Sequence, residues 1–172
     1  MKHLSILLLS LFTITSFSQI KVETFNSLKL DEKREVTIKL PSSYETNKTK
    51  SYPLLILLDG DYLMNPITGA LTYGAYWDDL PEVIVVGISQ NQKNERATDC
   101  GVDVVTGMPE GKSIQFFDFI GLELVPYIQS KFRTTPFKII AGHDVTAAFI
   151  NFFLYKDKPL FNPYISMSPE LP

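Results

Sequence analysis

Residues 137–149, with the sequence FKIIAGHDVTAAF, constrain the fold more than any other part of the chain. A short apolar run ends at Gly142, and small residues follow from Thr146. This pattern predicts a buried strand, a sharp turn and the beginning of a helix. Asp144 lies at the predicted turn. The structural setting and chemical role of this aspartate are therefore the central questions about the chain.

Two further apolar runs predict strands that are buried on both faces. Residues 53–58 are followed by Asp59 and Gly60, and residues 83–88 follow Pro81. Continuous apolar runs of this length are typical of parallel strands covered by helices on both sides. We expect these two strands to pair in parallel with residues 137–141, and we expect the last of the three to be central.

The remaining segments complete an alternation of strands and helices. Residues 113–131 have apolar side chains at spacings of three and four, which predicts a helix with Ser113 as its N-cap and a kink at Pro126. We also expect helices within 65–80 and over 146–155, a long loop over 89–112, and strands over 20–25, 28–40 and 163–168. The order indicates an α/β fold, a mostly parallel sheet with helices on both faces.

The first 18 residues predict a secretory signal peptide. Lys2 precedes a largely apolar run, and small residues end the segment at Ser18. The run is too short for the roughly 20 residues that cross a bilayer, so we expect no stable membrane span. Cleavage between Ser18 and Gln19 would leave a secreted or periplasmic domain over residues 19–172.

Charge and residue counts exclude several classes of function. Removal of residues 1–18 leaves 15 basic and 19 acidic residues, a formal charge of −4. With no basic block, nucleic acid is a poor partner. Cys100 is the only cysteine, so neither an internal disulfide nor a thiolate zinc site can form, and we expect no metal and no cofactor. His143 is the only histidine after residue 18, so no second imidazole is present to activate Cys100.

Several segments in order resemble the esterase branch of the α/β-hydrolase superfamily. That branch includes siderophore esterases, S-formylglutathione hydrolase and feruloyl-esterase-like secreted enzymes. The resemblance spans about residues 28–172, and it is carried by residues 52–60, 85–88, 94–96 with Asp99, 116–120, 123–128, 132–134, 141–143 and 165–169. It implies an α/β-hydrolase-like fold and a carboxylic-ester hydrolase that acts on a small-molecule ester or sugar-type ligand.

The chain departs from the family pattern in two respects. The nucleophile motif Gly-x-Ser-x-Gly has Asp144 in place of serine and Thr146 in place of the second glycine. In this fold the acid and the histidine of the triad follow later strands, so we expect a C-terminally truncated domain whose last strand has an open edge. The resemblance thus implies a hydrolase that is inactive or altered in this chain.

Three interpretations of Asp144 remain open at this point. It is a carboxylate nucleophile, as in dehalogenases and epoxide hydrolases, which the local Gly142-His143-Asp144 resembles. It is a cap of the following helix. Or it marks a lost serine in a non-catalytic binding or scaffold domain. Thr146 argues against the first, because its position crowds a neighbouring element.

The resemblance also assigns residues around the turn. An oxyanion hole would use the Val145 N–H and an N–H near Gly60 and Asp61, although a plain turn explains these two equally well. Arg96 and Asp99 resemble a loop that lines the cleft, with a surface ion pair as the alternative. His143 is a cleft residue or a structural residue. The oligomeric state does not follow from the sequence.

Overall fold

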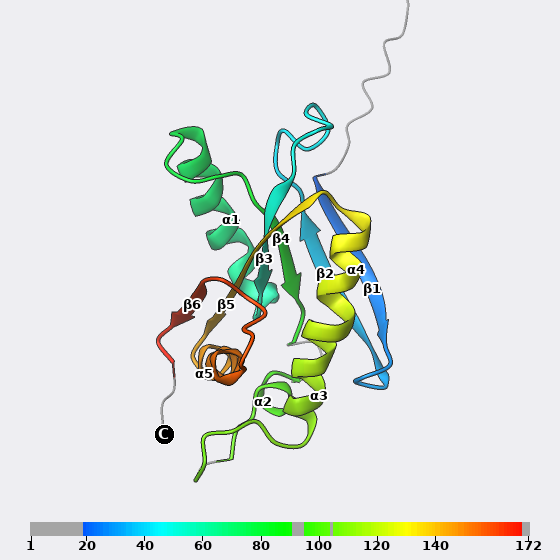
Figure 1. Ribbon diagram of the computed structural model, residues 1–172, viewed down its shortest axis with the longest axis vertical. Helices are drawn as coiled ribbons and strands as arrows, with labels where there is room; N and C mark the ends of the chain where they lie inside the picture. The colour runs from blue at the N-terminus through cyan, green and yellow to red at the C-terminus, as the bar shows by residue number, and fades with distance from the viewer. Residues whose placement is uncertain (1–18, 91–94, 104, 170–172) are drawn as a thin grey trace, which may run out of the picture.

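The computed structural model describes residues 19–90, 95–103 and 105–169, and the predicted signal peptide and Asn94 lie outside these ranges. Six strands form one sheet in the order β1-β2-β4-β3-β5-β6 (Figure 1). The strands are β1 (Ile20–Ser27), β2 (Glu32–Lys39), β3 (Tyr52–Leu57), β4 (Ile84–Ile88), β5 (Thr134–His143) and β6 (Tyr164–Met167).

The pairing confirms the predicted mostly parallel sheet. β4, β3, β5 and β6 run parallel, whereas β1 and β2 add an antiparallel edge. The prediction that residues 137–141 form the central strand is wrong, because β3 lies between β4 and β5. β6 pairs with β5 alone, and among the described residues no strand covers its other edge.

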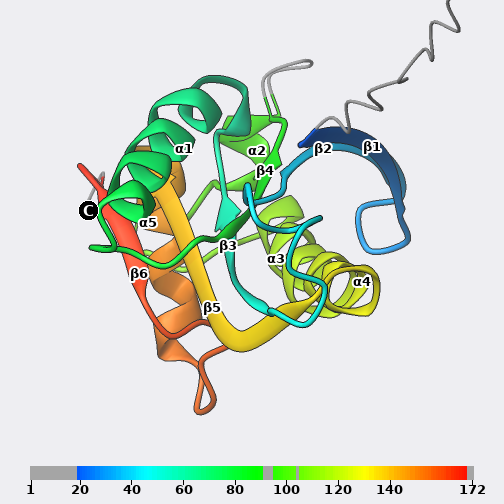
Figure 2. The ribbon, with the colours of Figure 1, turned by 90° about the horizontal axis from the view of Figure 1, so that it is seen from above.

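Helices cover both faces of the sheet. They are α1 (Gly60–Tyr76), α2 (Arg96–Asp99), α3 (Lys112–Asp118), the π-helix η1 (Phe119–Leu124), α4 (Val125–Lys131), α5 (Val145–Ile150) and the 3₁₀-helix η2 (Asn151–Tyr155). Figure 2 shows α1 on one side of β3 and β4, with α3 and α4 on the other. None of the helices in the described ranges is long and apolar enough to cross a membrane.

Alternation along β3 divides the core between the two faces. Leu54 and Ile56 belong to a large cluster with residues of α3, η1, α4 and α5, whereas Leu55 and Leu57 belong to a smaller cluster beneath α1. Because both faces are buried, β3 reads as a continuous apolar run rather than an alternating one. The same argument explains why residues 83–88 gave an unambiguous strand prediction.

The N-cap predicted for the helix over 113–131 is wrong, and this segment is not a regular α-helix throughout. Gly111 rather than Ser113 occupies the N-cap position of α3, and the Ser113 hydroxyl contacts the Glu110 backbone from inside the first turn. Near Pro126, where the sequence predicts a kink, the π-helix η1 ends at Leu124 and α4 begins at Val125. A proline lacks the N–H for an α-helical bond and its ring clashes with the carbonyl four residues earlier, and a local π-turn accommodates both effects.

Other boundaries differ in simple ways. The predicted strand over 28–40 begins only at Glu32, because residues 28–31 form the turn of the β1–β2 hairpin, with Asp31 at φ 53°. α1 begins at Gly60, five residues before the predicted range. The loop over 89–112 contains the short helix α2, which lies near α5 and the elbow (Figure 1).

Candidate active site

Asp144 forms a strained turn between β5 and α5. Its backbone has φ 59° and ψ −120°, a conformation that is costly for any residue with a Cβ atom. The Gly142 Cα lies so close to α5 that an added Cβ would meet the Thr146 backbone at 2.8 Å. This strand–turn–helix arrangement is the geometry that a nucleophile elbow has, with the Asp144 carboxylate at the turn.

The Asp144 side chain does not cap α5. It makes no capping hydrogen bond, so the interpretation of this side chain as a helix cap is wrong. Its Oδ2 instead accepts a hydrogen bond from Arg96 Nη1 at 3.2 Å. The Asp144 side chain remains 46% exposed and can meet a ligand.

Arg96 connects the elbow to a second aspartate that the sequence analysis did not identify. Its Nε donates to Asp59 Oδ1 at 2.6 Å, and its Nη2 donates to the His143 carbonyl at 2.8 Å. Although burial disfavours the charge, the hydrogen bond and charge of Asp59 and the contact with Asp144 raise the pKa of Arg96 above its ordinary value. Arg96 therefore stays a guanidinium between two carboxylates.

Asp59 is completely buried at the carboxyl end of β3. Its Oδ2 accepts a hydrogen bond from Thr146 Oγ1 at 2.7 Å, and its backbone N–H donates to Gln90 Oε1 at 3.3 Å. Thr146 is fully buried, and its hydroxyl also accepts from the His143 N–H at 2.8 Å. The structure thus accommodates Thr146 at this predicted crowded position, because its hydroxyl forms hydrogen bonds with Asp59 and with the His143 backbone. An aspartate directly after a buried strand was the sequence signal for Asp59.

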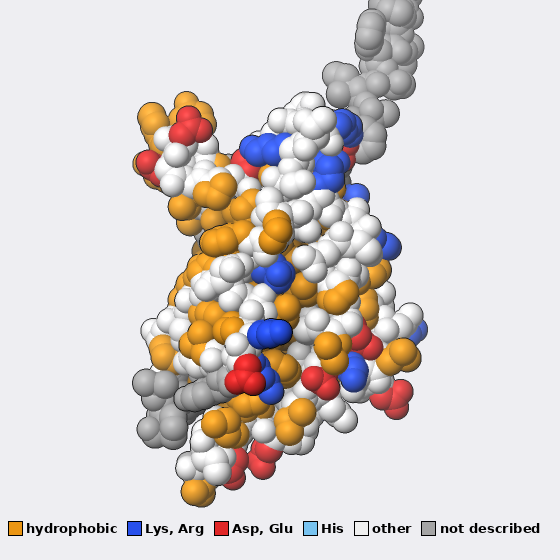
Figure 3. Space-filling model, in the orientation of Figure 1, with side chains coloured by type: hydrophobic (Ala, Val, Ile, Leu, Met, Phe, Trp, Pro, Cys, Tyr) orange, Lys and Arg blue, Asp and Glu red, His pale blue; other side chains and the backbone are white. Residues whose placement is uncertain are grey.

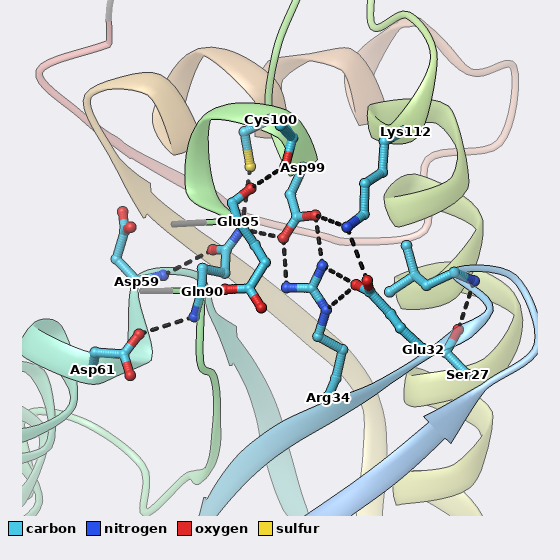
Figure 4. Close-up of polar contacts among 12 residues, drawn as sticks. Ser27, Glu32, Arg34, Asp59, Asp61, Gln90, Glu95, Asp99, Cys100 and Lys112 are labelled. Carbon is cyan, nitrogen blue, oxygen red and sulfur yellow. Dashed lines mark hydrogen bonds and ion pairs between the residues drawn. The ribbon is translucent and has the colours of Figure 1, made fainter. Parts of the chain in front are cut away.

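Asp99 pairs with a residue of the sheet rather than with Arg96. It is fully buried and forms a bidentate pair with Arg34 of β2, with both N–O distances at 2.7 Å (Figure 4). Gln90 Nε2 donates to Asp99 Oδ2 at 3.3 Å, and so links this pair to the Asp59 backbone. The alternative of a surface Arg96–Asp99 ion pair is wrong, because each residue pairs with another partner.

Gly60 and Asp61 hold the first turn of α1 against the loop after β4. A Cβ on Gly60 would lie 2.8 Å from Gly87 backbone atoms, so this position needs a glycine. The Asp61 carboxylate accepts from Ser89 Oγ at 2.7 Å and from the Gln90 N–H at 2.9 Å. The Asp61 side chain therefore connects the first turn of α1 to the loop after β4. Val145 is the first residue of α5.

The His143 ring points toward Tyr62 rather than into a dyad with Asp144. Its Nδ1 lies 3.1 Å from the Tyr62 hydroxyl, and the two rings meet edge to face. Cys100 is 1% exposed, and burial raises the pKa of its thiol far above the usual range. Within the described ranges, no group of three His, Cys, Asp or Glu residues could hold a metal ion.

Comparisons with known proteins place this geometry in a family. Residues 27–170 match the family described as "Putative esterase". An uncharacterised protein from Capnocytophaga ochracea DSM 7271 is 30% identical, with a TM-score of 0.80 over 90% of this chain and 41% of its own. An IroE-like serine hydrolase from Shewanella oneidensis is 27% identical, with a TM-score of 0.70 over 86% of this chain and 49% of its own.

A more distant structure shares the fold. Siderophore hydrolase EstB from Aspergillus nidulans is 20% identical, with a TM-score of 0.73 over 91% of this chain and 58% of its own. A search of curated proteins found no significant match. The chain thus spans 41% and 49% of the first two solved structures named. It belongs to the "Putative esterase" family and has the α/β-hydrolase fold.

Proposed function

We propose that this chain is an exported esterase-family domain with an altered elbow that does not hydrolyse carboxylic esters by the serine mechanism. Its ligand is a small ester or sugar-type molecule, bound at the carboxyl ends of the parallel strands. The observation that carries the proposal is the Asp144 carboxylate at the turn between β5 and α5, in contact with Arg96 at 3.2 Å.

The electrostatics of the elbow oppose ester hydrolysis. In acyl transfer the carbonyl oxygen becomes an oxyanion, which backbone N–H groups beside the nucleophile stabilise. A carboxylate at position 144 places negative charge near that oxygen and offers no hydroxyl for attack. His143, the only histidine after residue 18, engages Tyr62, so it is not positioned as the base.

Hydrolysis of p-nitrophenyl acetate and butyrate tests the proposal. We expect the wild-type chain to show no rate above buffer. Asp144→Ser alone should also remain inactive, because loss of the base by itself costs about 10⁴-fold or more. Turnover by the wild type that disappears in a folded Asp144→Ala variant would overturn the proposal.

A second candidate is an aspartate-based hydrolase. The strained backbone at φ 59° and the 46% exposed side chain present the Asp144 carboxylate as an elbow nucleophile would be presented. In that chemistry a carboxylate oxygen attacks an alkyl carbon, the carbon–halogen bond breaks, and halide leaves with the electron pair. The contact with Arg96 opposes this step by lowering the nucleophilicity of the carboxylate.

Mass spectrometry after incubation with 1-bromobutane separates the two candidates. An aspartate nucleophile would leave a butyl ester on Asp144 that is absent from Asp144→Asn. The non-hydrolytic domain leaves the mass of the peptide unchanged. An Asp144-specific adduct would therefore favour the second candidate over the first.

Export is part of the same proposal. Cleavage before Gln19 would leave β1 intact, since that strand begins at Ile20, and would retain the Gln19 carbonyl that accepts from the Leu40 N–H at 2.8 Å. N-terminal sequencing of the exported protein should begin at Gln19. A mature protein that begins at Met1 would remove this part of the proposal.

A further inference from the structure

A cavity lies at the opposite end of the sheet from the elbow. It has a volume of about 320 Å³ and lies between the C-terminal half of α1 and the strands β2 and β4. Lys39 at the end of β2 and Val83 just before β4 both line it. Because β3, β4 and β5 run parallel, this is the amino end of those strands, whereas Asp144 follows the carboxyl end of β5.

The walls of this cavity are largely apolar. Leu71 of α1 and Val85 of β4 line it, together with Val83. Tyr76 forms an outer wall and is 76% exposed. Hydrophobic side chains gather at the same end of α1 in Figure 3. A cavity of this size with an aromatic rim suits a small ligand that has an apolar body.

Two charged residues line the cavity, Glu82 and Lys39, and only Glu82 is paired within the described part of the protein. The Glu82 carboxylate already accepts hydrogen bonds from Ser42, Ser43 and Lys50, with Lys50 Nζ at 2.8 Å. Although partial burial disfavours its charge, these bonds lower the pKa of Glu82 to about 2. The carboxylate therefore stays ionised, and its oxygens are already engaged by these donors.

Lys39 differs from Glu82 in this respect. Among the residues that the structure describes, no carboxylate lies within ion-pair distance of its ammonium group. Glu82 shares the cavity with Lys39 but is paired with Lys50. Of the two charged residues that line the cavity, Lys39 is therefore the one without an ion-pair partner among the described residues.

We propose that this cavity is a binding site for a small monocarboxylate with an apolar body, with the carboxylate at Lys39 and the apolar part between Leu71, Tyr76 and Val83. The site is separate from the elbow and does not depend on the chemistry of Asp144.

An NMR titration of the purified chain with benzoate, compared with the neutral isostere benzamide, tests the site. We expect millimolar benzoate to shift the amide signals of Lys39, Thr72 and Val85. Benzamide should bind about fivefold more weakly, because a half-exposed ion pair contributes on the order of 1 kcal/mol. Lys39→Met should remove the preference for benzoate, whereas Lys33→Met on the same strand should retain it.

A filling variant keeps the proposal testable if Lys39→Met is poorly folded. Ala75→Leu places extra side-chain volume in the cavity on a residue that favours helix, and it should abolish the shifts from both compounds. Equal affinities for benzoate and benzamide would overturn the proposal. So would benzoate shifts that concentrate around Arg96, or shifts that are unchanged in both Lys39→Met and Ala75→Leu.

Discussion

Two strand-to-helix turns lie side by side at the carboxyl edge of the sheet, and they use the same residue type in different ways. Asp59 follows β3 with φ 56°, and Asp144 follows β5 with φ 59°. Both carboxylates contact Arg96. Yet the Asp59 side chain is 0% exposed and the Asp144 side chain is 46% exposed. One aspartate is a structural part of the edge, and the other is available to a ligand.

The difference follows from the partners of each carboxylate. Asp59 has one oxygen on Arg96 and the other on Thr146, so both are satisfied inside the protein. Asp144 has a single contact with Arg96, at the longer distance of 3.2 Å. Stability should therefore depend strongly on the first turn and weakly on the second.

Asp59→Ala should give the largest loss of stability. It removes the fully buried carboxylate that pairs with Arg96 Nε and accepts from the Thr146 hydroxyl, which is left with its contacts to the His143 backbone. Removing one member of such a buried pair costs about 3–5 kcal/mol. Urea unfolding followed by circular dichroism would measure the change. A loss below about 1 kcal/mol would show that water replaces the missing carboxylate and that the two turns are equivalent.

Gly60→Ala should rank second. An added Cβ would lie 2.8 Å from the Gly87 backbone, which cannot rotate away as a side chain could. We expect a cost of about 2–3 kcal/mol from overpacking, measured by the same unfolding assay. Gly69→Ala is the matched control in the same helix, since nothing lies within 4 Å of its added Cβ. It should stabilise the chain by about 0.5–1 kcal/mol, because alanine favours helix.

Thr146→Val tests the hydrogen bond that joins the two turns. Valine keeps the shape but leaves Asp59 Oδ2 without its 2.7 Å donor, at a cost of about 1–2 kcal/mol. Thr146→Ser retains the hydroxyl and should lose less, since only a methyl group is removed. If both variants unfold alike, packing rather than the hydrogen bond accounts for the presence of threonine here.

The sequence predicted the strands well because apolar runs are local. Residues 53–58 and 83–88 are buried on both faces, so no long-range information was needed. Arg34 had a visible signal too, since it alternates with the buried Val36 and Ile38, but its partner Asp99 is 65 residues away. No spacing rule connects the two, and the surface alternative for Asp99 failed for that reason.

The sequence predicted the turn at Asp144 but not the hydrogen bonds that hold this turn in place. Gly142 and the small residues after Asp144 indicated the turn, because only a close strand–helix approach needs them. Thr146 looked like a clash, since a β-branched residue replaces the second glycine of the motif. Its place depends on Asp59, which lies 87 residues earlier and meets it only in the folded sheet.

Asp144→Ala should have the smallest effect among the variants at these two turns. The ion pair that it removes is partly exposed and screened, so its loss costs less than about 1 kcal/mol. Arg96 keeps Asp59 and the His143 carbonyl as acceptors. Alanine remains strained at φ 59°, whereas Asp144→Gly relieves that strain and should be more stable than Asp144→Ala by about 1 kcal/mol. Thermal unfolding of the two variants side by side measures the difference. If Asp144→Ala unfolds at as low a temperature as Asp59→Ala, the exposed aspartate stabilises the fold as much as the buried one. The turn at Asp144 would then stabilise the edge of the sheet rather than form a binding site.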